Sequence, residues 1–121
     1  ALEMLLEATA KEPMDNRLIA LFGDIDEAKA GQLCYNLYVL SRDTRYSPKN
    51  AEDLTEGLVE VVDPIELMIC SPGGNASEMF AIYDAMRVVR ESCEIETFGV
   101  GKVMSAGVLV LAAGTKAAFI M

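Results

Sequence analysis

The stretch IELMICSPGGNASEMFAIYDAMRVVR, residues 65–90, combines three local signals in one order. Its first six residues are mostly apolar, which predicts a buried strand, and SPGGN after them predicts a turn. From residue 76 to residue 90 the apolar residues recur at intervals of three and four, which predicts a helix with Met79, Ile82, Tyr83, Met86 and Val89 on one face. A strand followed by a helix is half of the unit from which parallel sheets are built.

The same alternation extends along the chain in both directions. RLIALFG, residues 17–23, predicts a strand, and Asp24 or Asp26 then caps a helix whose apolar face is Ala30, Leu33, Cys34, Leu37 and Leu40. Residues 95–100 predict another strand, residues 104–113 an apolar helix with Gly114 at its C-cap, and a last strand begins at residue 116. The sequence therefore predicts an α/β domain with a mostly parallel sheet flanked by helices.

Three further segments have weaker signals. Residues 2–11 predict a short helix, which Pro13 ends. The polar residues 41–50 predict a loop. Asn50 is expected to cap another helix, which ends at Asp63-Pro64 and buries Leu54, Leu58 and Val61.

The composition excludes several classes of function. The net charge of −9 argues against nucleic-acid partners and against anionic membrane surfaces. No signal peptide is visible, and the longest uncharged stretch, residues 103–115, is too short to span a bilayer. Without histidine, CxxC or a phosphate-loop motif, we expect no metal site and no cofactor. The three cysteines are expected to be free buried thiols in a reducing, cytoplasmic compartment: Cys34, Cys70 and Cys93.

Two glycine-bearing turns, SPGGN and GVGKVMS, each follow a predicted strand and precede a predicted helix. Because neighbouring parallel strands end at one edge of a sheet, the two turns are expected to meet there. Gly73 and Gly74 allow positive φ and close approach of a ligand to the backbone, although a plain tight turn explains them as well.

Ser105 lies in the second turn, at the start of the apolar helix. A nucleophile there would have the Ala106 N–H beside it as a donor to an oxyanion, and Gly74 could supply a second N–H. The alternative is that Ser105 only caps the helix. Since the sequence contains no histidine, the residue that would take the serine proton is not evident from these residues.

MICSPGGNASEMFAIYDAMR, residues 68–87, followed by TFGVGKVMSAGVLVLAAGTK, residues 97–116, resembles the proteolytic subunit of the Clp protease, the ClpP family of serine peptidases. The shared features are a Ser-Pro-Gly-Gly turn, an Ile-Tyr-Asp-x-Met segment and a Gly-x-x-x-Ser-x-Gly turn opening a buried helix. NRLIALFGDID is also similar to the first core strand of that family.

The resemblance implies a ClpP/crotonase-like fold and an ATP-dependent serine endopeptidase that cleaves unfolded polypeptides through an acyl-enzyme on Ser105. It implies oxyanion donors at the Gly74 and Ala106 N–H groups and binding of the substrate strand at Gly73 and Gly74. The catalytic His and Asp would lie beyond Met121, so residues 1–121 would form a single, C-terminally incomplete head domain. The implied partners are other copies in a ring and an AAA+ unfoldase ATPase, in the cytoplasm or in an organellar stroma or matrix.

Three alternatives remain open. The chain could be a non-catalytic structural subunit of a Clp ring, because it has no histidine. It could be a relative of the crotonases, which share the fold and hold a thioester enolate with paired N–H groups. Lys102 could act as a base in a Ser-Lys dyad, although its position three residues before Ser105 in the same turn favours a solvent-facing side chain.

Overall fold

The computed structural model of the chain describes residues 17–50 and 52–120, and the structural statements below concern these residues. The helix predicted over residues 2–11 lies outside them. In chain order the elements are β1 (Leu18–Phe22), α2 (Glu27–Ser41), β2 (Arg45–Pro48), a 3-10 helix (Leu54–Glu56), β3 (Leu58–Val61), β4 (Ile65–Ser71), α3 (Ala76–Val89), β5 (Ile95–Val103), α4 (Ala106–Ala112) and β6 (Lys116–Ile120).

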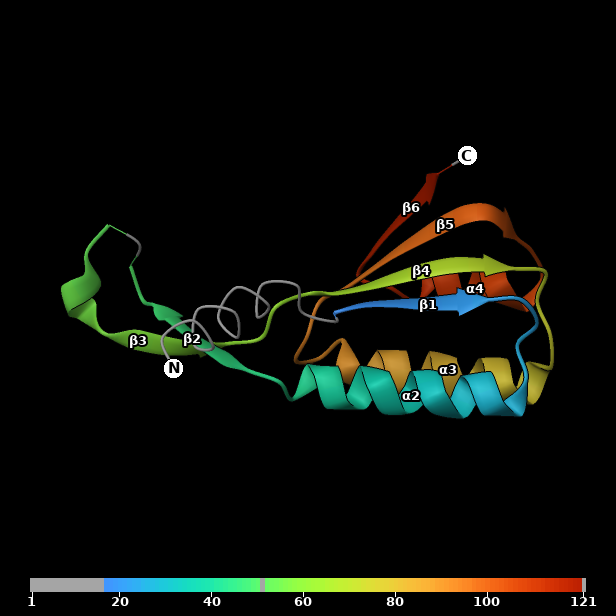
Figure 1. Cartoon of the computed structure of the whole chain (residues 1–121), viewed down its shortest axis with the longest axis horizontal. Helices are drawn as coiled ribbons and strands as arrows, with labels where there is room; N and C mark the ends of the chain where they lie inside the picture. Colours follow the sequence, from blue (N-terminus) through green and yellow to red (C-terminus); the bar gives the residue numbers. More distant parts are fainter. Residues whose placement is uncertain (1–16, 51, 121) are drawn as a thin grey trace, which may run out of the picture.

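A four-stranded sheet forms the body of the domain, in the order β1-β4-β5-β6, and every neighbouring pair is parallel. Along the chain, each new strand of this sheet is added on the same side of the preceding one. Because connections between parallel strands are right-handed, the connecting helices α2, α3 and α4 then lie on one face of the sheet. Figure 1 shows α2 and α3 side by side beneath β1 and β4. The predicted α/β architecture is confirmed.

The core lies between this sheet face and the helices. In β4 the buried residues alternate with more exposed ones, and the helical residues at spacings of three and four face them. Fully buried side chains from these elements include Ile65, Leu67, Ile69, Ile82 and Met86. Asp26 accepts a hydrogen bond from the Lys29 N–H at 2.8 Å and caps α2, and Asn75 caps α3 through the Ser77 N–H.

The opposite face of the sheet is open, so the apolar run of residues 17–23 is buried only on the side of β1 that faces the helices. Leu18 and Phe22 are about half exposed, at 51% and 50%, because they point away from the helices. Among the cysteines, Cys93 is buried as expected, whereas Cys34 and Cys70 are only partly buried. Among the helices of residues 17–50 and 52–120, none has the length and apolar character needed to span a bilayer.

The helix predicted after Asn50 is wrong, and so is the reading of residues 41–50 as loop alone. β2 and β3 pair antiparallel as a separate two-stranded sheet that projects from the body (Figure 1). Leu54 and Leu58 are 69% and 65% exposed instead of buried. Gly57 has φ +96, which ends the helical turn, and the residues after it, LVEVV, favour an extended strand.

Arg17 joins the start of β1 to the base of this hairpin. Its side chain is 8% exposed, and its guanidinium donates to the carbonyl oxygens of Leu40 at 3.1 Å, Asp63 at 2.6 Å and Pro64 at 3.2 Å. These three carbonyls belong to the end of α2 and to the segment that leads into β4. The buried guanidinium of Arg17 is therefore stabilised by carbonyl oxygens that precede and follow the β2–β3 hairpin in the chain.

Candidate functional site

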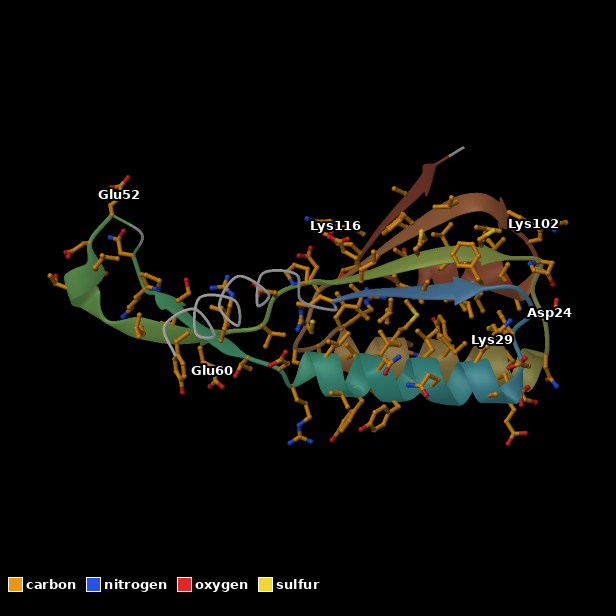
Figure 2. The ribbon with its side chains drawn as sticks, viewed as in Figure 1. Asp24, Lys29, Glu52, Glu60, Lys102 and Lys116 are labelled. Carbon is orange, nitrogen blue, oxygen red and sulfur yellow. The ribbon has the colours of Figure 1, made fainter. Side chains whose placement is uncertain are left out.

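The candidate site lies where β4 and β5 end next to each other. Ser71 is the last residue of β4, and its register partner in β5 is Val103, two residues before Ser105. The register shifts between Ile69 and Ser71, and Gly101, at φ +72, lies in the part of β5 opposite this shift. The two predicted glycine turns therefore meet at one edge of the sheet. Figure 2 shows Lys102 and Asp24 at this end of the four-stranded sheet and Lys116 toward its other end.

The backbone of Ser105 has an unusual conformation. Its φ is 54° and its ψ is −125°, and it is the one non-glycine residue with positive φ in the described part of the chain. Such a strained strand-to-helix turn holds a nucleophilic serine exposed in hydrolases, and backbone strain at a serine suggests a functional constraint. Ser105 is exposed, and although it occupies the N-cap position of α4, its side chain makes no capping hydrogen bond. The interpretation of Ser105 as a helix cap is therefore not supported.

Gly73 packs directly against the serine. Its φ is +107, and a Cβ atom built on it would lie 2.8 Å from Ser105 Cβ, 3.1 Å from the Met104 carbonyl oxygen and 3.2 Å from the Ala106 nitrogen. Both the backbone angle and the lack of space therefore require glycine at this position. The Pro-Gly-Gly turn is one wall of the site and not only a tight turn.

Gly74 approaches the chain on its other side. The Ile25 N–H donates to the Gly73 carbonyl oxygen at 2.9 Å, and the Asn75 N–H donates to the Ile25 carbonyl oxygen at 3.1 Å. These two hydrogen bonds form an isolated parallel β-bridge between Ile25 and Gly74. In such a bridge the flanking residues Gly73 and Asn75 make the hydrogen bonds, so the Gly74 N–H points away from Ile25. A Cβ on Gly74 would lie 2.4 Å from the Ile25 carbonyl oxygen, so a side chain does not fit.

The two N–H groups expected to bind an oxyanion are both available. Within residues 17–50 and 52–120, neither the Gly74 N–H nor the Ala106 N–H donates a hydrogen bond, whereas the next amide of α4, that of Gly107, donates to the Met104 carbonyl oxygen at 3.0 Å. Unpaired N–H groups next to a serine hydroxyl can stabilise the negative oxygen of a tetrahedral intermediate.

Ser71 is a residue of this site that the sequence reasoning missed. Its hydroxyl donates to the Gly23 carbonyl oxygen at 2.6 Å and accepts from the Gly73 N–H at 3.0 Å, and its own carbonyl oxygen accepts from the Met104 N–H at 3.0 Å. The available signal was a serine placed directly before Pro-Gly-Gly at the end of a predicted strand. Its partner Gly23 is 48 residues away, so no local pattern indicates that contact.

Other candidate chemistry finds little support. Lys102 is exposed, and no hydrogen bond joins it to Ser105 in the described structure. Burial raises the pKa of the Cys34 thiol. Burial also raises the pKa of the Cys93 thiol, and this effect outweighs the lowering by neighbouring Arg17. Neither cysteine is therefore an activated thiolate. No group of three metal-ligating side chains comes together among the residues described.

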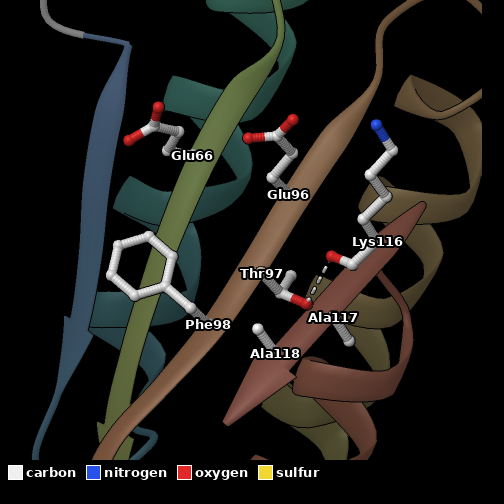
Figure 3. A pocket seen from close by; sticks show the side chains of 7 residues that line it. All are labelled: Glu66, Glu96, Thr97, Phe98, Lys116, Ala117 and Ala118. Carbon is white, nitrogen blue, oxygen red and sulfur yellow. Dashed lines mark hydrogen bonds between the residues drawn. The ribbon is translucent and has the colours of Figure 1, made fainter. Parts of the chain in front are cut away.

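A hollow of about 390 Å³ opens over the other end of β4, β5 and β6 (Figure 3). Glu66, Glu96 and Lys116 lie in one row across these strands, and Phe98 borders the hollow beside them. These residues lie near the beginnings of the strands, whereas Ser105 follows the end of β5. The hollow is therefore separate from the site around Ser105.

Comparison with known proteins gives a consistent result. A family profile described as Clp protease matches residues 6–121. ATP-dependent Clp protease proteolytic subunit 1 of Corynebacterium jeikeium is 37% identical over 100 residues, which cover 83% of this chain and 44% of that protein. Subunit 2 of Mycolicibacterium paratuberculosis is 34% identical over 112 residues, covering 93% of this chain and 47% of that protein. The chain thus spans about half the length of these relatives.

Solved structures show the same fold. ClpP1 from Listeria monocytogenes superposes with a TM-score of 0.64 at 22% identity, over 88% of this chain and 51% of that one. The ClpP protease catalytic domain from Plasmodium falciparum gives a TM-score of 0.62 at 27% identity, over 82% of this chain and 44% of that one.

Proposed function

This chain belongs to the Clp protease family, and from that premise we propose that it carries the nucleophile and the oxyanion hole of a serine endopeptidase. The observation that supports this most directly is the strained, exposed Ser105, which packs against Gly73; within the described residues, neither the Gly74 N–H nor the Ala106 N–H donates a hydrogen bond. A nucleophile needs an accessible hydroxyl, and acyl transfer needs donors directed at the developing oxyanion. A serine that only capped α4 would require neither.

In this proposal the Ser105 Oγ attacks the carbonyl carbon of a peptide bond. The carbonyl oxygen gains negative charge and accepts hydrogen bonds from the N–H groups of Gly74 and Ala106. The tetrahedral intermediate collapses to an acyl-enzyme on Ser105 and releases the amine, and water then hydrolyses the ester. The proton of Ser105 goes to a His oriented by an Asp, both lying beyond Met121, as the resemblance implies.

The substrate is a polypeptide in an extended conformation. We place it along the Gly73-Gly74 turn. Because glycine has no side chain, the backbone of a substrate strand can approach the backbone of this turn closely enough to pair with it. The relatives are named as ATP-dependent proteolytic subunits. By analogy, this chain assembles with further copies in a ring and receives unfolded substrates from an AAA+ ATPase in the cytoplasm or an organellar matrix.

The test is hydrolysis of a short fluorogenic peptide by the complete protein in its assembled form. Ser105→Ala is expected to reduce the rate to the background level, whereas Ser92→Ala, which changes an exposed serine after α3, is expected to leave it unchanged. No hydrolysis by the unsubstituted protein, together with co-assembly with an active relative, would instead support a non-catalytic structural subunit. Hydrolysis that survives in Ser105→Ala would contradict the assignment of the nucleophile.

A further inference from the structure

We propose that Ser71 is a positioning residue that holds the oxyanion-binding turn and the nucleophile turn in register. This inference rests on the proposed function, because it assigns to Ser71 the geometry on which that reaction depends. Ser71 is fully buried, with 0% exposure, so its hydroxyl has no access to bulk solvent or substrate. Its role can therefore be exerted only through the groups that it contacts.

The hydroxyl of Ser71 uses both its donor and its acceptor capacity. Its hydrogen is directed at the Gly23 carbonyl oxygen, 2.6 Å away, and a lone pair accepts the Gly73 N–H at 3.0 Å. The Gly73 carbonyl oxygen, at 3.4 Å, is a longer second contact. The first turn is therefore fixed to the end of β1 through a single side chain.

The peptide groups on both sides of Gly73 are held by hydrogen bonds. The Gly73 N–H is held toward Ser71, and the Gly73 carbonyl oxygen accepts from the Ile25 N–H at 2.9 Å. The peptide group between Gly73 and Gly74 is planar, so its orientation sets the direction of the Gly74 N–H. Because glycine is otherwise free to rotate about φ and ψ, the Ser71 contact acts together with the Ile25 contact to limit the orientations open to this oxyanion donor.

The backbone of Ser71 holds the second turn. Its carbonyl oxygen accepts the Met104 N–H at 3.0 Å, immediately before Ser105. The nearby Gly107 of α4 would bring a Cβ within 3.4 Å of the same carbonyl oxygen, so the helix packs closely here. One buried residue thus connects the donor at Gly74 with the nucleophile at Ser105.

Replacing the hydroxyl should impair catalysis more than substrate binding. Ser71→Ala leaves the buried Gly73 N–H without its acceptor and the Gly23 carbonyl oxygen without this donor, so the turn relaxes and the Gly74 N–H moves. Misplacement of a reacting group by about 1 Å can cost about a hundredfold in rate. We expect kcat to fall by about ten- to a hundredfold, and KM to change by a smaller factor, because the substrate also lies along this turn.

The matched control is Thr97→Val, which removes another buried hydroxyl. Thr97 is 2% exposed, and its Oγ1 donates to the Leu111 carbonyl oxygen at 2.6 Å, at the far end of α4 from Ser105. This variant should lower the melting temperature as Ser71→Ala does but leave kcat unchanged. Ser71→Thr, which keeps the hydroxyl, should recover most of the kcat lost in Ser71→Ala.

The experiment measures kcat and KM for a short peptide, and the affinity of a peptide boronic acid, with the complete assembled protein. In Ser71→Ala the boronic acid, which forms a tetrahedral adduct with serine, should lose affinity in parallel with kcat. If Ser71→Ala does not assemble, Ser71→Cys, with its weaker hydrogen bonds, replaces it and should show the same pattern. A kcat within about twofold of the unsubstituted protein, or an equal loss in Thr97→Val, would overturn the role of Ser71. An inactive unsubstituted protein would overturn the proposed function itself.

Discussion

A Cβ atom on Gly73 would lie 2.8 Å from the Cβ of Ser105, closer than side chains pack in folded proteins. The two residues are 32 positions apart in the sequence and belong to different turns. Their contact brings the Pro-Gly-Gly turn and the serine turn together into one candidate site.

Gly73→Ala is expected to abolish peptide hydrolysis, because the new methyl group displaces either Ser105 or the turn. Gly57→Ala is the matched control: Gly57 also has positive φ, +96, but a Cβ built on it would have no neighbouring atom of the described residues within 4 Å. Positive φ alone costs a non-glycine residue about 1–3 kcal/mol. Urea unfolding should therefore show a lower free energy of unfolding in both variants, while peptide hydrolysis disappears only in Gly73→Ala. Full activity in Gly73→Ala would contradict the close contact with Ser105.

Arg17→Met is expected to lower the free energy of unfolding by about 2–4 kcal/mol, because three carbonyl oxygens lose a charged donor that is nearly buried. Arg42→Met removes an exposed guanidinium and should change the free energy of unfolding by less than about 0.5 kcal/mol. Urea denaturation measures both values. Equal stabilities of the two variants would show that Arg17 does not hold the base of the hairpin.

Asp26→Ala is expected to destabilise the protein by about 1 kcal/mol, because the Lys29 N–H at the start of α2 loses its acceptor. Asp24→Ala removes a carboxylate two residues earlier that makes no side-chain hydrogen bond in the described structure. The change in unfolding free energy should be within about 0.5 kcal/mol for this control. A loss of the same size in both variants would assign the effect to charge and not to the cap.

The pH dependence of stability should contain a contribution from Asp63. The hydrogen bond from Arg45, at 2.7 Å, and its positive charge hold the pKa of the Asp63 carboxyl below its ordinary value in the folded protein. Stabilisation by such a group is present above the unfolded-state pKa, about 3.9, and is lost as the pH falls through the folded-state pKa.

Asp63→Asn should therefore lower the melting temperature near neutral pH, and the difference from the unsubstituted protein should shrink below about pH 4. Both side chains are partly exposed, so the difference should also be smaller at high ionic strength. Melting curves from pH 3 to pH 7 measure this. A difference that stays constant across the range would show that the ion pair does not contribute.

The central α/β unit could be predicted from the sequence because its signals are local. The buried residues of β4 alternate along the strand, and those of α3 from Met79 to Val89 recur every three or four positions. Both patterns follow from which side of the element faces the core, so they can be read from a short stretch of sequence. The meeting of the two turns was also predictable, because parallel strands end at a common edge. The positive φ of Ser105 and the lack of a capping bond from its side chain depend on the packing of the two turns, which no local pattern indicates.

The hairpin could not be recognised by the same reasoning. Leu54, Leu58 and Val61 have helical spacing, but this pattern is meaningful only where one face is buried, and here Leu54 and Leu58 face solvent. The positive φ of Gly57 was the local feature that separated a strand from a helix. The contacts of Ser71 and Arg17 join residues up to 48 positions apart, so no local pattern predicts them.

The most direct test of the account is to locate the covalent adduct formed by a fluorophosphonate probe with the complete protein. Tryptic cleavage after Lys102 and Lys116 gives the peptide of residues 103–116, whose single serine is Ser105. We predict that fragmentation of this peptide by mass spectrometry places the adduct on Ser105, and that Ser105→Ala removes it. An adduct on another residue, or none on an assembled protein that hydrolyses peptides, would contradict Ser105 as the nucleophile.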